Sequence, residues 1–271
     1  MADIVNWNPR RVGGRLRRLP RPIRRFLERP VNNFGDLLGP LIVERLLCQF
    51  GLVNDRSDGR RLLVVGSILH LARTGDVVWG GGRNGKVAES DHRFETLDVR
   101  SVRGPRTAAW LQERNIAVPP VFGDSALLLP RLLPELNDHA QTKRTDVLYV
   151  PNFNDLAVTS DARTLNPRSP LDVCLKEIVQ SRFVVGSSLH AVIVAEAFGI
   201  PARAIRSRTE LPFKYEDHFL GTGRPDFILA EDYQHALGLG GERPLEWDAV
   251  PLLEAFPRDL FSVNGVVQTD G

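Results

Sequence analysis

The chain has 271 residues, of which 42% are apolar, 25% charged and 7% aromatic, with two cysteines and a net charge of +2. This is the composition of a globular protein with a sizeable core, and the length exceeds the usual size of one core, so two subdomains are expected. Cys48 and Cys174 lack the spacing of a metal site, and neither a long apolar run nor a signal-like N-terminus is present, so we expect a cytoplasmic protein without a bound metal.

The first 30 residues concentrate positive charge. They carry nine arginines against Asp3 and Glu28, a net charge of +7, so the rest of the chain carries −5. A short strand is expected at residues 3–7, and glycine and proline breaks limit the basic stretch that follows to a short amphipathic piece at residues 22–30. Arginines mixed with apolar residues favour peripheral contact of residues 10–30 with an anionic membrane face. The alternative is a disordered basic tail without a partner.

Helical and strand patterns alternate after this segment. Apolar residues at helical spacing predict a helix over residues 32–50, with Gly51 as its stop. Three apolar runs predict buried strands, at residues 61–67, 76–82 and 97–102. Residues 104–116, with Pro105 in the first turn, predict a helix. Strands that are apolar throughout are typical of a parallel α/β sheet covered on both faces.

The same pattern restarts in the second half. Strands are expected at residues 146–152, 183–188 and 202–207, and helices at residues 169–182 and 189–199. The polar, proline-bounded residues 130–145 are interpreted as the linker. Two Rossmann-like halves that face a cleft would bind ligands at the carboxyl ends of their strands. The expected domains are the Arg-rich segment with the first strand (1–30), an N-terminal domain (31–140), a C-terminal domain (141–225) and an extension that packs on the body (226–271).

The sequence VVGSSLH, residues 184–190, leaves a buried strand and enters a helix. Ser187 or Ser188 is placed to cap that helix, and the N–H groups of its first turn form an anion site. His190 lies in this first turn. Either it handles a bound anion, or it is a helix histidine satisfied by a neighbouring carbonyl.

Two glycine-containing loops offer further candidates for ligand contact. In NNFGD, at the start of the first long helix, Gly35 allows close approach of the backbone, and Asp36 either caps the helix or hydrogen-bonds hydroxyls. The loop WGGGRNGK contributes Arg83 and Lys86, although it matches neither the phosphate-loop pattern nor the dinucleotide-binding pattern.

Two charged segments have an ordinary interpretation beside the functional one. Arg103, in VRGP at a strand end, suits bidentate pairing with phosphate or carboxylate, or else is a surface arginine. Residues 212–224, PFKYEDHFLGTGR, concentrate charged and aromatic side chains that a solvated helix explains equally well.

Together these segments resemble the polysaccharide pyruvyl transferase family. Six stretches between residues 32 and 220 carry the resemblance, in order NNFGDLLGP, VVGSILHLARTGDVVWGGG, VRSVRGPRTAAWL, VFGDSALLLP, VVGSSLHAVIVAEAFGIPA and FKYEDHF. Trp7-Asn8-Pro9 also looks like the family's first strand, which makes residues 10–30 an insertion. The resemblance implies a GT-B-like α/β fold. It also implies transfer of pyruvate from phosphoenolpyruvate onto a saccharide as a cyclic ketal, without a redox cofactor.

The resemblance also implies roles for individual residues. The family's Ser-Leu-His motif falls on Ser188-Leu189-His190, which makes His190 the expected acid/base group, and its Arg-Gly-Pro motif makes Arg103 the expected clamp on the donor anion. The residues expected to bind the donor are Ser187, Ser188, Leu189, Lys214 and Arg83. The residues expected on the acceptor side are Asn33, Gly35 and Asp36. The acceptor itself is expected to be a saccharide built on a lipid carrier.

Two other functions remain open at this point. AEAFGIP, residues 195–201, resembles the Glu-containing donor helix of nucleotide-sugar glycosyltransferases of the GT-B type, and fold alone does not decide function. The other alternative is a non-catalytic protein whose basic leader binds nucleic acid or anionic lipid. The acidic body, and arginines without interleaved aromatic residues, argue against nucleic acid.

Overall fold

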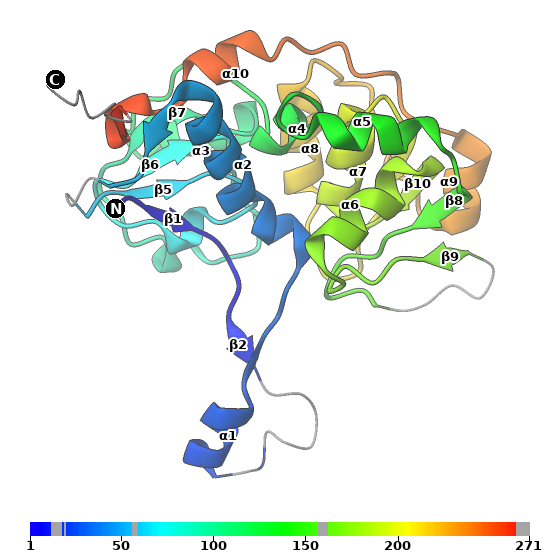
Figure 1. The fold of residues 1–271 in the computed structure, drawn as a ribbon, viewed down its shortest axis with the longest axis horizontal. Coiled ribbons are helices and arrows are strands. Elements are labelled where there is room, and N and C mark those ends of the chain that lie inside the picture. Colours follow the sequence, from blue (N-terminus) through cyan, green and yellow to red (C-terminus); the bar gives the residue numbers. More distant parts are fainter. Residues whose placement is uncertain (12–17, 19, 56–58, 157–161, 264–271) are drawn as a thin grey trace, which may run out of the picture.

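Two four-stranded parallel sheets form the body of the protein (Figure 1). The computed structural model describes residues 1–11, 18, 20–55, 59–156 and 162–263. The first sheet has the order β1-β5-β6-β7, with β1 Asp3–Val5, β5 Arg61–Leu63, β6 Val77–Trp79 and β7 Asp98–Ser101. The second has the order β11-β10-β8-β9, with β8 Thr145–Tyr149, β9 Arg163–Thr164, β10 Ser181–Gly186 and β11 Ala202–Ala204. The expected α/β class with parallel sheets is confirmed.

Helices follow the strands as the periodicity predicts. The α-helices of the body are α2 Phe34–Phe50, α3 Pro105–Gln112, α4 Leu129–Leu132, α5 Pro134–Gln141, α6 Leu171–Val179, α7 Leu189–Ala197, α8 Phe213–Gly221, α9 Tyr233–Leu239 and α10 Val250–Glu254. Short 3₁₀ turns are η2 Leu69–Leu71, η3 Glu89–Asp91, η4 Ser125–Leu128 and η5 Arg258–Leu260. Gly51 ends α2 with φ 61°, a left-handed conformation that glycine adopts without strain.

The expected linker at residues 130–145 is largely helical. Pro130 and Pro134 stand in the first turns of α4 and α5, where a missing N–H costs nothing. Leu132, Leu133 and Leu136 are buried in the main core. Leucines that return to one face of a helix therefore outweigh the polar residues between them.

Both faces of the first sheet are buried, as its uninterrupted apolar strands predict. Neighbouring residues on one strand belong to different clusters: Leu62 packs with α2 in the main core, whereas Leu63 packs with α3 on the opposite face. Val77 and Val78 divide in the same way. The main core continues through α2 and α7 into the second sheet, so both sheets share one apolar interior.

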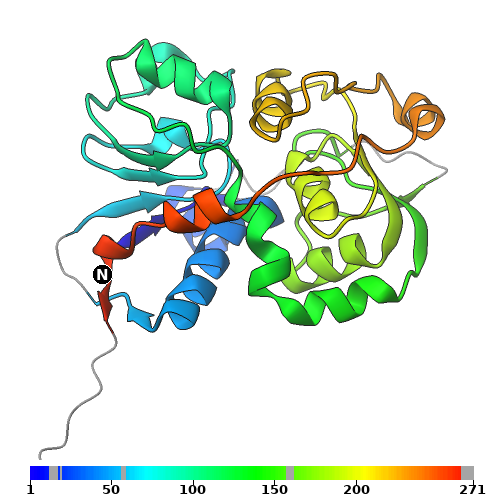
Figure 2. The same ribbon diagram turned by 90° about the horizontal axis from the view of Figure 1, so that it is seen from above.

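The last described part of the chain returns to the first sheet (Figure 2). Strand β12, Ser262–Val263, pairs antiparallel with β4, Leu52–Val53. The buried indole Nε1 of Trp79 donates a hydrogen bond to the carbonyl of Leu252 at 2.8 Å, and the rings of Trp79 and Phe256 meet edge to face. The C-terminal segment around Leu252 and Phe256 thus completes the core around Trp79 of the first sheet. The expected domain boundaries stay a prediction.

An arm projects from the body near the N-terminus (Figure 1). Strands β2, Arg10–Arg11, and β3, Arg29–Pro30, pair antiparallel at its base, and helix α1, Arg21–Leu27, lies beyond them. This helix confirms the short amphipathic piece expected in the basic segment. Residues 12–17 and 19, with Val12, Arg15, Leu16, Arg17 and Leu19, lie outside the described residues. No helix in the described part of the chain is long and apolar enough to cross a membrane.

Candidate active site

A cavity of about 210 Å³ lies between the two sheets. Its wall from the first half consists of the start of α2 and the loops after β5 and β6, and its wall from the second half consists of the segments that follow β8, β10 and β11. Ligand sites of parallel sheets are found at such strand ends. The predicted site residues that the cavity brings together are Asn33, Asp36, Leu189, His190 and Lys214.

His190 stands in the first turn of α7, after the N-cap residue Ser188. Its Nε2 is buried without a hydrogen-bond partner among the described residues, so a neighbouring carbonyl does not satisfy it. Burial, together with the positive charges of Arg103 and Lys214, lowers the pKa of His190 to about 3. The imidazole is therefore neutral near pH 7, and an anion bound beside it would favour its protonated form.

The two serines before His190 do not cap α7 with their side chains. Ser188 is the N-cap residue but makes no side-chain cap hydrogen bond. The hydroxyl of Ser187 instead accepts a hydrogen bond from the backbone N–H of Asn152 at 2.9 Å, which ties the end of β10 to the loop after β8. The prediction that Ser187 or Ser188 is the N-cap residue is thus confirmed for Ser188, although its side chain makes no cap hydrogen bond.

Gly35 lies directly against His190, and Asp36 lines the same cavity. A Cβ on Gly35 would stand 2.0 Å from His190 Nδ1, so only glycine lets the imidazole pack on α2. The Asp36 carboxylate accepts a hydrogen bond from Asn33 Nδ2 at 2.6 Å, and burial raises its pKa to about 7. Gly66 leaves space beside both groups, since its Cβ would lie 3.3 Å from Asp36 Oδ1 and 3.8 Å from His190 Cε1. The structure thus joins the expected donor and acceptor motifs in one place.

Two lysines in the cavity share one carboxylate. Lys214 Nζ lies 3.6 Å from Glu210 Oε2, and Lys86 Nζ pairs with the other oxygen of Glu210. Asn154 Nδ2 donates to this second oxygen at 3.2 Å. Burial lowers the pKa of Lys214 to about 8, against the opposing attraction of Glu210. The site therefore holds two cations whose internal partner an incoming anion can replace.

Arg103 is not among the residues that line the cavity. Its guanidinium is fully buried, lies 3.1 Å from Asp217 Oδ2, and donates to Ser67 Oγ at 2.8 Å and to the Arg83 carbonyl at 2.7 Å. A Cβ on Gly104 would come within 1.8 Å of the Asp217 carbonyl oxygen. The Arg-Gly-Pro segment therefore joins the first sheet to α8, and Arg103 reaches the cavity only through Ser67. Direct contact with a donor stays a prediction.

Arg83 lies outside the cavity as well. Its guanidinium pairs with Glu89 and stacks over the ring of Trp110 at 4.6 Å. Lys86, three residues further along the same loop, is the cation that lines the cavity. The glycine-rich loop thus supplies a positive charge from a different residue than the one expected to bind the donor.

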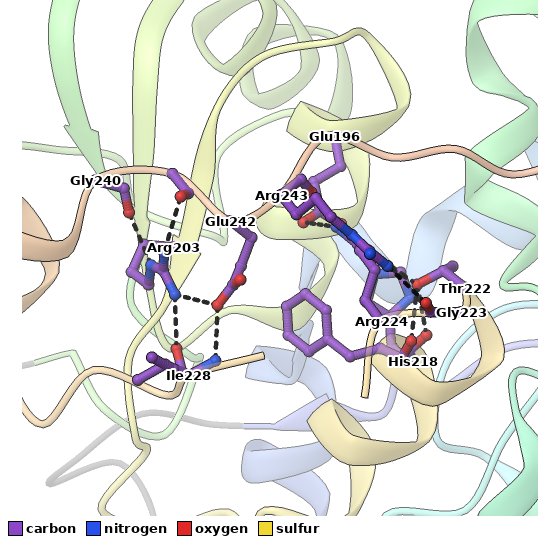
Figure 3. Close-up of polar contacts among 12 residues, drawn as sticks. Glu196, Arg203, His218, Thr222, Gly223, Arg224, Ile228, Gly240, Glu242 and Arg243 are labelled. Atoms are coloured by element: carbon purple, nitrogen blue, oxygen red, sulfur yellow. Dashed lines mark hydrogen bonds and ion pairs between the residues drawn. The ribbon is translucent and has the colours of Figure 1, made fainter. Parts of the chain in front are cut away.

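The charged cluster at residues 212–224 is buried, so its interpretation as a solvated helix is wrong (Figure 3). Arg224 donates to both carboxylate oxygens of Glu196 at 2.7 and 2.8 Å, and His218 Nε2 lies 3.0 Å from the same carboxylate. Thr222 Oγ1 accepts from Arg224 Nε at 3.1 Å. These partners lower the pKa of Glu196 against the opposing effect of burial. The network keeps Glu196 ionised inside the protein, where the carboxylate is already paired.

Among the cavity residues that the sequence reasoning missed are two with titratable side chains, His70 and Glu210. Glu210 stands four residues before Lys214, and this spacing signals a pair within one helical turn. His70 ends the sequence GSILH, which repeats the GSSLH that ends in His190.

Comparisons with known proteins show what the chain is similar to. A family model described as polysaccharide pyruvyl transferase matches residues 61–208. The succinoglycan biosynthesis protein ExoV of Rhizobium meliloti is 29% identical over 207 residues, which are 71% of this chain and 62% of that protein. The match thus spans less than two thirds of that relative's length. Among solved structures, a functionally uncharacterised protein of Klebsiella pneumoniae has a TM-score of 0.45 at 13% identity, over 74% of this chain and 89% of that one.

Proposed function

The chain belongs to the polysaccharide pyruvyl transferase family, and we propose that it transfers pyruvate from phosphoenolpyruvate onto two hydroxyls of a saccharide as a cyclic ketal. The proposed acceptor is a saccharide made during exopolysaccharide synthesis. The name of the similar succinoglycan biosynthesis protein supports this class of acceptor. The two parallel sheets that face one cavity support a GT-B-like arrangement of the halves.

The observation that carries this proposal is the charge arrangement around His190. Phosphoenolpyruvate places a phosphate and a carboxylate on one small carbon frame. The cavity offers Lys86 and Lys214, held on Glu210, beside the unpartnered Nε2 of His190 at the start of α7. A donor anion would replace Glu210 at the lysines and gain from the helix N-terminus, since such ends favour negative charge.

The same arrangement supplies an acid for the first chemical step. The methylene carbon of the donor must gain a proton, and the neighbouring carbon then becomes an oxocarbenium-like centre that a sugar hydroxyl attacks. His190 is neutral in the free protein and takes up a proton as the donor anion binds, which makes it the proton source. Asn33 and Asp36, on the opposite wall, are proposed to hydrogen-bond the sugar hydroxyls.

A phosphate-release assay tests the proposal. The purified protein is mixed with phosphoenolpyruvate and a panel of lipid-linked and nitrophenyl glycosides, and the ketal is identified by mass spectrometry. We expect phosphate release that requires an acceptor and is lost in His190→Ala. Release of phosphate at the same rate by wild type and His190→Ala would contradict the assignment, and an acceptor panel without any product would refute pyruvyl transfer to these saccharides.

A nucleotide-sugar glycosyltransferase is not favoured by the structure. That alternative assigns a donor role to Glu196, whose two oxygens are occupied by Arg224 and His218 (Figure 3). Thermal shift separates the two functions, because a ligand that binds only the folded protein stabilises it by an amount that grows with the ratio of ligand concentration to Kd. Phosphoenolpyruvate should raise the melting temperature, whereas nucleoside diphosphates should not.

The projecting arm supports a location at the cytoplasmic face of a membrane. Its helix α1 exposes Phe26 and Ile23, with 88% and 50% of their surfaces accessible. Six arginines of the arm are also exposed, namely Arg10, Arg11, Arg18, Arg21, Arg25 and Arg29. Apolar side chains among basic ones suit an anionic lipid surface, where each basic residue contributes about 1 kcal/mol. The free thiols of Cys48 and Cys174 fit the reducing side of that membrane.

The arm is connected to the body beside the cavity. The arm begins after Trp7 and ends before Asn33, and both of these residues line the cavity. A membrane that binds α1 would therefore present a lipid-linked saccharide near the cavity. This geometry favours a lipid-linked acceptor over a free polymer.

Vesicle co-sedimentation tests the arm without reference to the reaction. The double variant Ile23→Ser with Phe26→Ser should bind anionic vesicles more weakly than wild type, and high salt should weaken binding of both. Val173→Ser is the matched control, since Val173 is an exposed apolar residue of α6 on the body. Equal binding to neutral and anionic vesicles, or equal binding by all variants, would contradict membrane contact through the arm.

A further inference from the structure

One short sequence pattern occurs twice in the chain. Residues 64–70 read VVGSILH and residues 184–190 read VVGSSLH, so only one position differs. Each copy stands at the carboxyl end of a strand inside its sheet, β5 between β1 and β6, and β10 between β11 and β8. Each leads into a helical turn, η2 after the first copy and α7 after the second. The two halves therefore place the same residue types at the same position in their sheets, although a three-residue 3₁₀ turn follows the first copy and a nine-residue α-helix follows the second.

The two histidines of this pattern line the same cavity from opposite halves. The leucine before each is buried in a core, Leu69 fully and Leu189 with 4% of its surface exposed. Each buried leucine fixes its turn, and the next side chain, His70 or His190, contributes to the cavity wall. The proposed function uses only one of these imidazoles.

Resting on the proposed function, we propose that His70 is a second catalytic residue, which accepts the proton of the second sugar hydroxyl when the ketal ring closes. Ring closure is chemically separate from the first addition, because the reaction forms two bonds to the same carbon. A second base in the cavity, on the half of the protein opposite His190, supplies the group that this step needs.

The two steps balance as follows. In the first, His190 gives its proton to C3, which becomes a methyl group, the oxygen of one hydroxyl bonds to C2 of phosphoenolpyruvate, and the proton of that hydroxyl returns to His190. In the second, the bond from C2 to the phosphate oxygen breaks and the phosphate leaves with the electron pair. The second hydroxyl oxygen then bonds to C2 as its proton moves to His70. His70 passes this proton to the departing phosphate, so the diol and phosphoenolpyruvate yield the ketal and phosphate.

The two histidines have different charged neighbours, which suit them to different proton transfers. His190 lies near Arg103 and Lys214, which oppose its protonation until an anion binds. His70 lies on the opposite wall, near Lys86, His92 and Asp91, and burial lowers its pKa below the ordinary value. A neutral imidazole at pH 7 is in the state that a proton acceptor requires.

Three matched variants test this division, namely His70→Gln, His190→Gln and His139→Gln. His139 belongs to α5, outside the cavity, and serves as the control. Calorimetry measures phosphoenolpyruvate affinity, and ketal formation is followed against pH with a glycoside that the wild type accepts. We expect His70→Gln to bind phosphoenolpyruvate like wild type and to lose about 10²–10⁴-fold in kcat, together with the acidic limb of the pH profile. His190→Gln should lose donor affinity, and His139→Gln should change nothing.

Other results overturn the proposal. A kcat for His70→Gln within a few-fold of wild type, an unchanged acidic limb, or loss of donor affinity like that of His190→Gln would each exclude His70 as the base for ring closure. If the glutamine variant does not fold, His70→Ala with added imidazole replaces it: rescue of ketal formation supports the proposal, and a folded variant without rescue contradicts it. A wild-type protein that forms no ketal with any acceptor would refute the proposed function itself, which is a different outcome.

Discussion

The substitution Asp36→Asn should stabilise the protein at neutral and alkaline pH. Burial raises the pKa of Asp36 from 3.8 to about 7, so in the folded protein the ionised carboxylate is disfavoured relative to the unfolded chain. At 1.36 kcal/mol for each pH unit of difference, the folded state loses about 4 kcal/mol between pH 4 and pH 7, because only the unfolded chain ionises in this range. The asparagine oxygen still accepts the hydrogen bond from Asn33 and carries no charge.

Thermal unfolding from pH 4 to pH 8.5 measures this effect. The two proteins should melt together near pH 4, and the variant should melt about 10 °C higher above pH 7. Asp146→Asn is the control, because the Asp146 side chain is 92% exposed. A melting difference that does not depend on pH, or a variant that is less stable at pH 8, would refute the reasoning. The variant should also lose pyruvyl transfer, because substitutions that stabilise a protein at a functional group commonly reduce its activity.

Three further predictions concern the donor side. His190→Ala should lower pyruvyl transfer about 10²–10⁴-fold without a large change in melting temperature, and activity within a few-fold of wild type would exclude it as the acid. Arg103→Lys should lower the melting temperature, because Asp217 would lose its buried guanidinium partner, and breaking such a buried pair costs about 3–5 kcal/mol. An unchanged melting temperature with lost donor affinity would show that the guanidinium binds the donor instead. Affinity for phosphoenolpyruvate should fall as the pH rises above about 8, where Lys214 loses its proton, and calorimetry at pH 7 and pH 9 decides this.

Local sequence patterns predicted the strands and helices because the signals that form them are local. Apolar runs that end in glycine mark β6 and β10, and Gly51 stops α2 where the periodicity ends. The position of His190 in the first turn of α7 follows from the same kind of pattern.

Burial of charged residues could not be predicted in this way, because their partners are distant in the sequence. Asp217 is held by Arg103 and Thr107, more than 100 residues before it, and no periodicity in α8 reveals that pairing. Arg103 itself was expected at a ligand, since a strand-end arginine before a helix looks the same whether it meets an anion or an internal carboxylate. Sequence reasoning therefore located the cavity but not the ion pairs behind it.

The return of the chain end to the first sheet has a consequence for biosynthesis. A ribosome releases Trp79 long before Leu252, yet the indole N–H finds its acceptor only when that carbonyl arrives. Until then Trp79 lacks both this acceptor and the Phe256 ring that packs on it, and β4 lacks its neighbour β12. The N-terminal half should therefore remain incompletely folded during translation and become native only after the C-terminal segment emerges, so that nascent chains truncated before residue 250 are protease-sensitive in their N-terminal half.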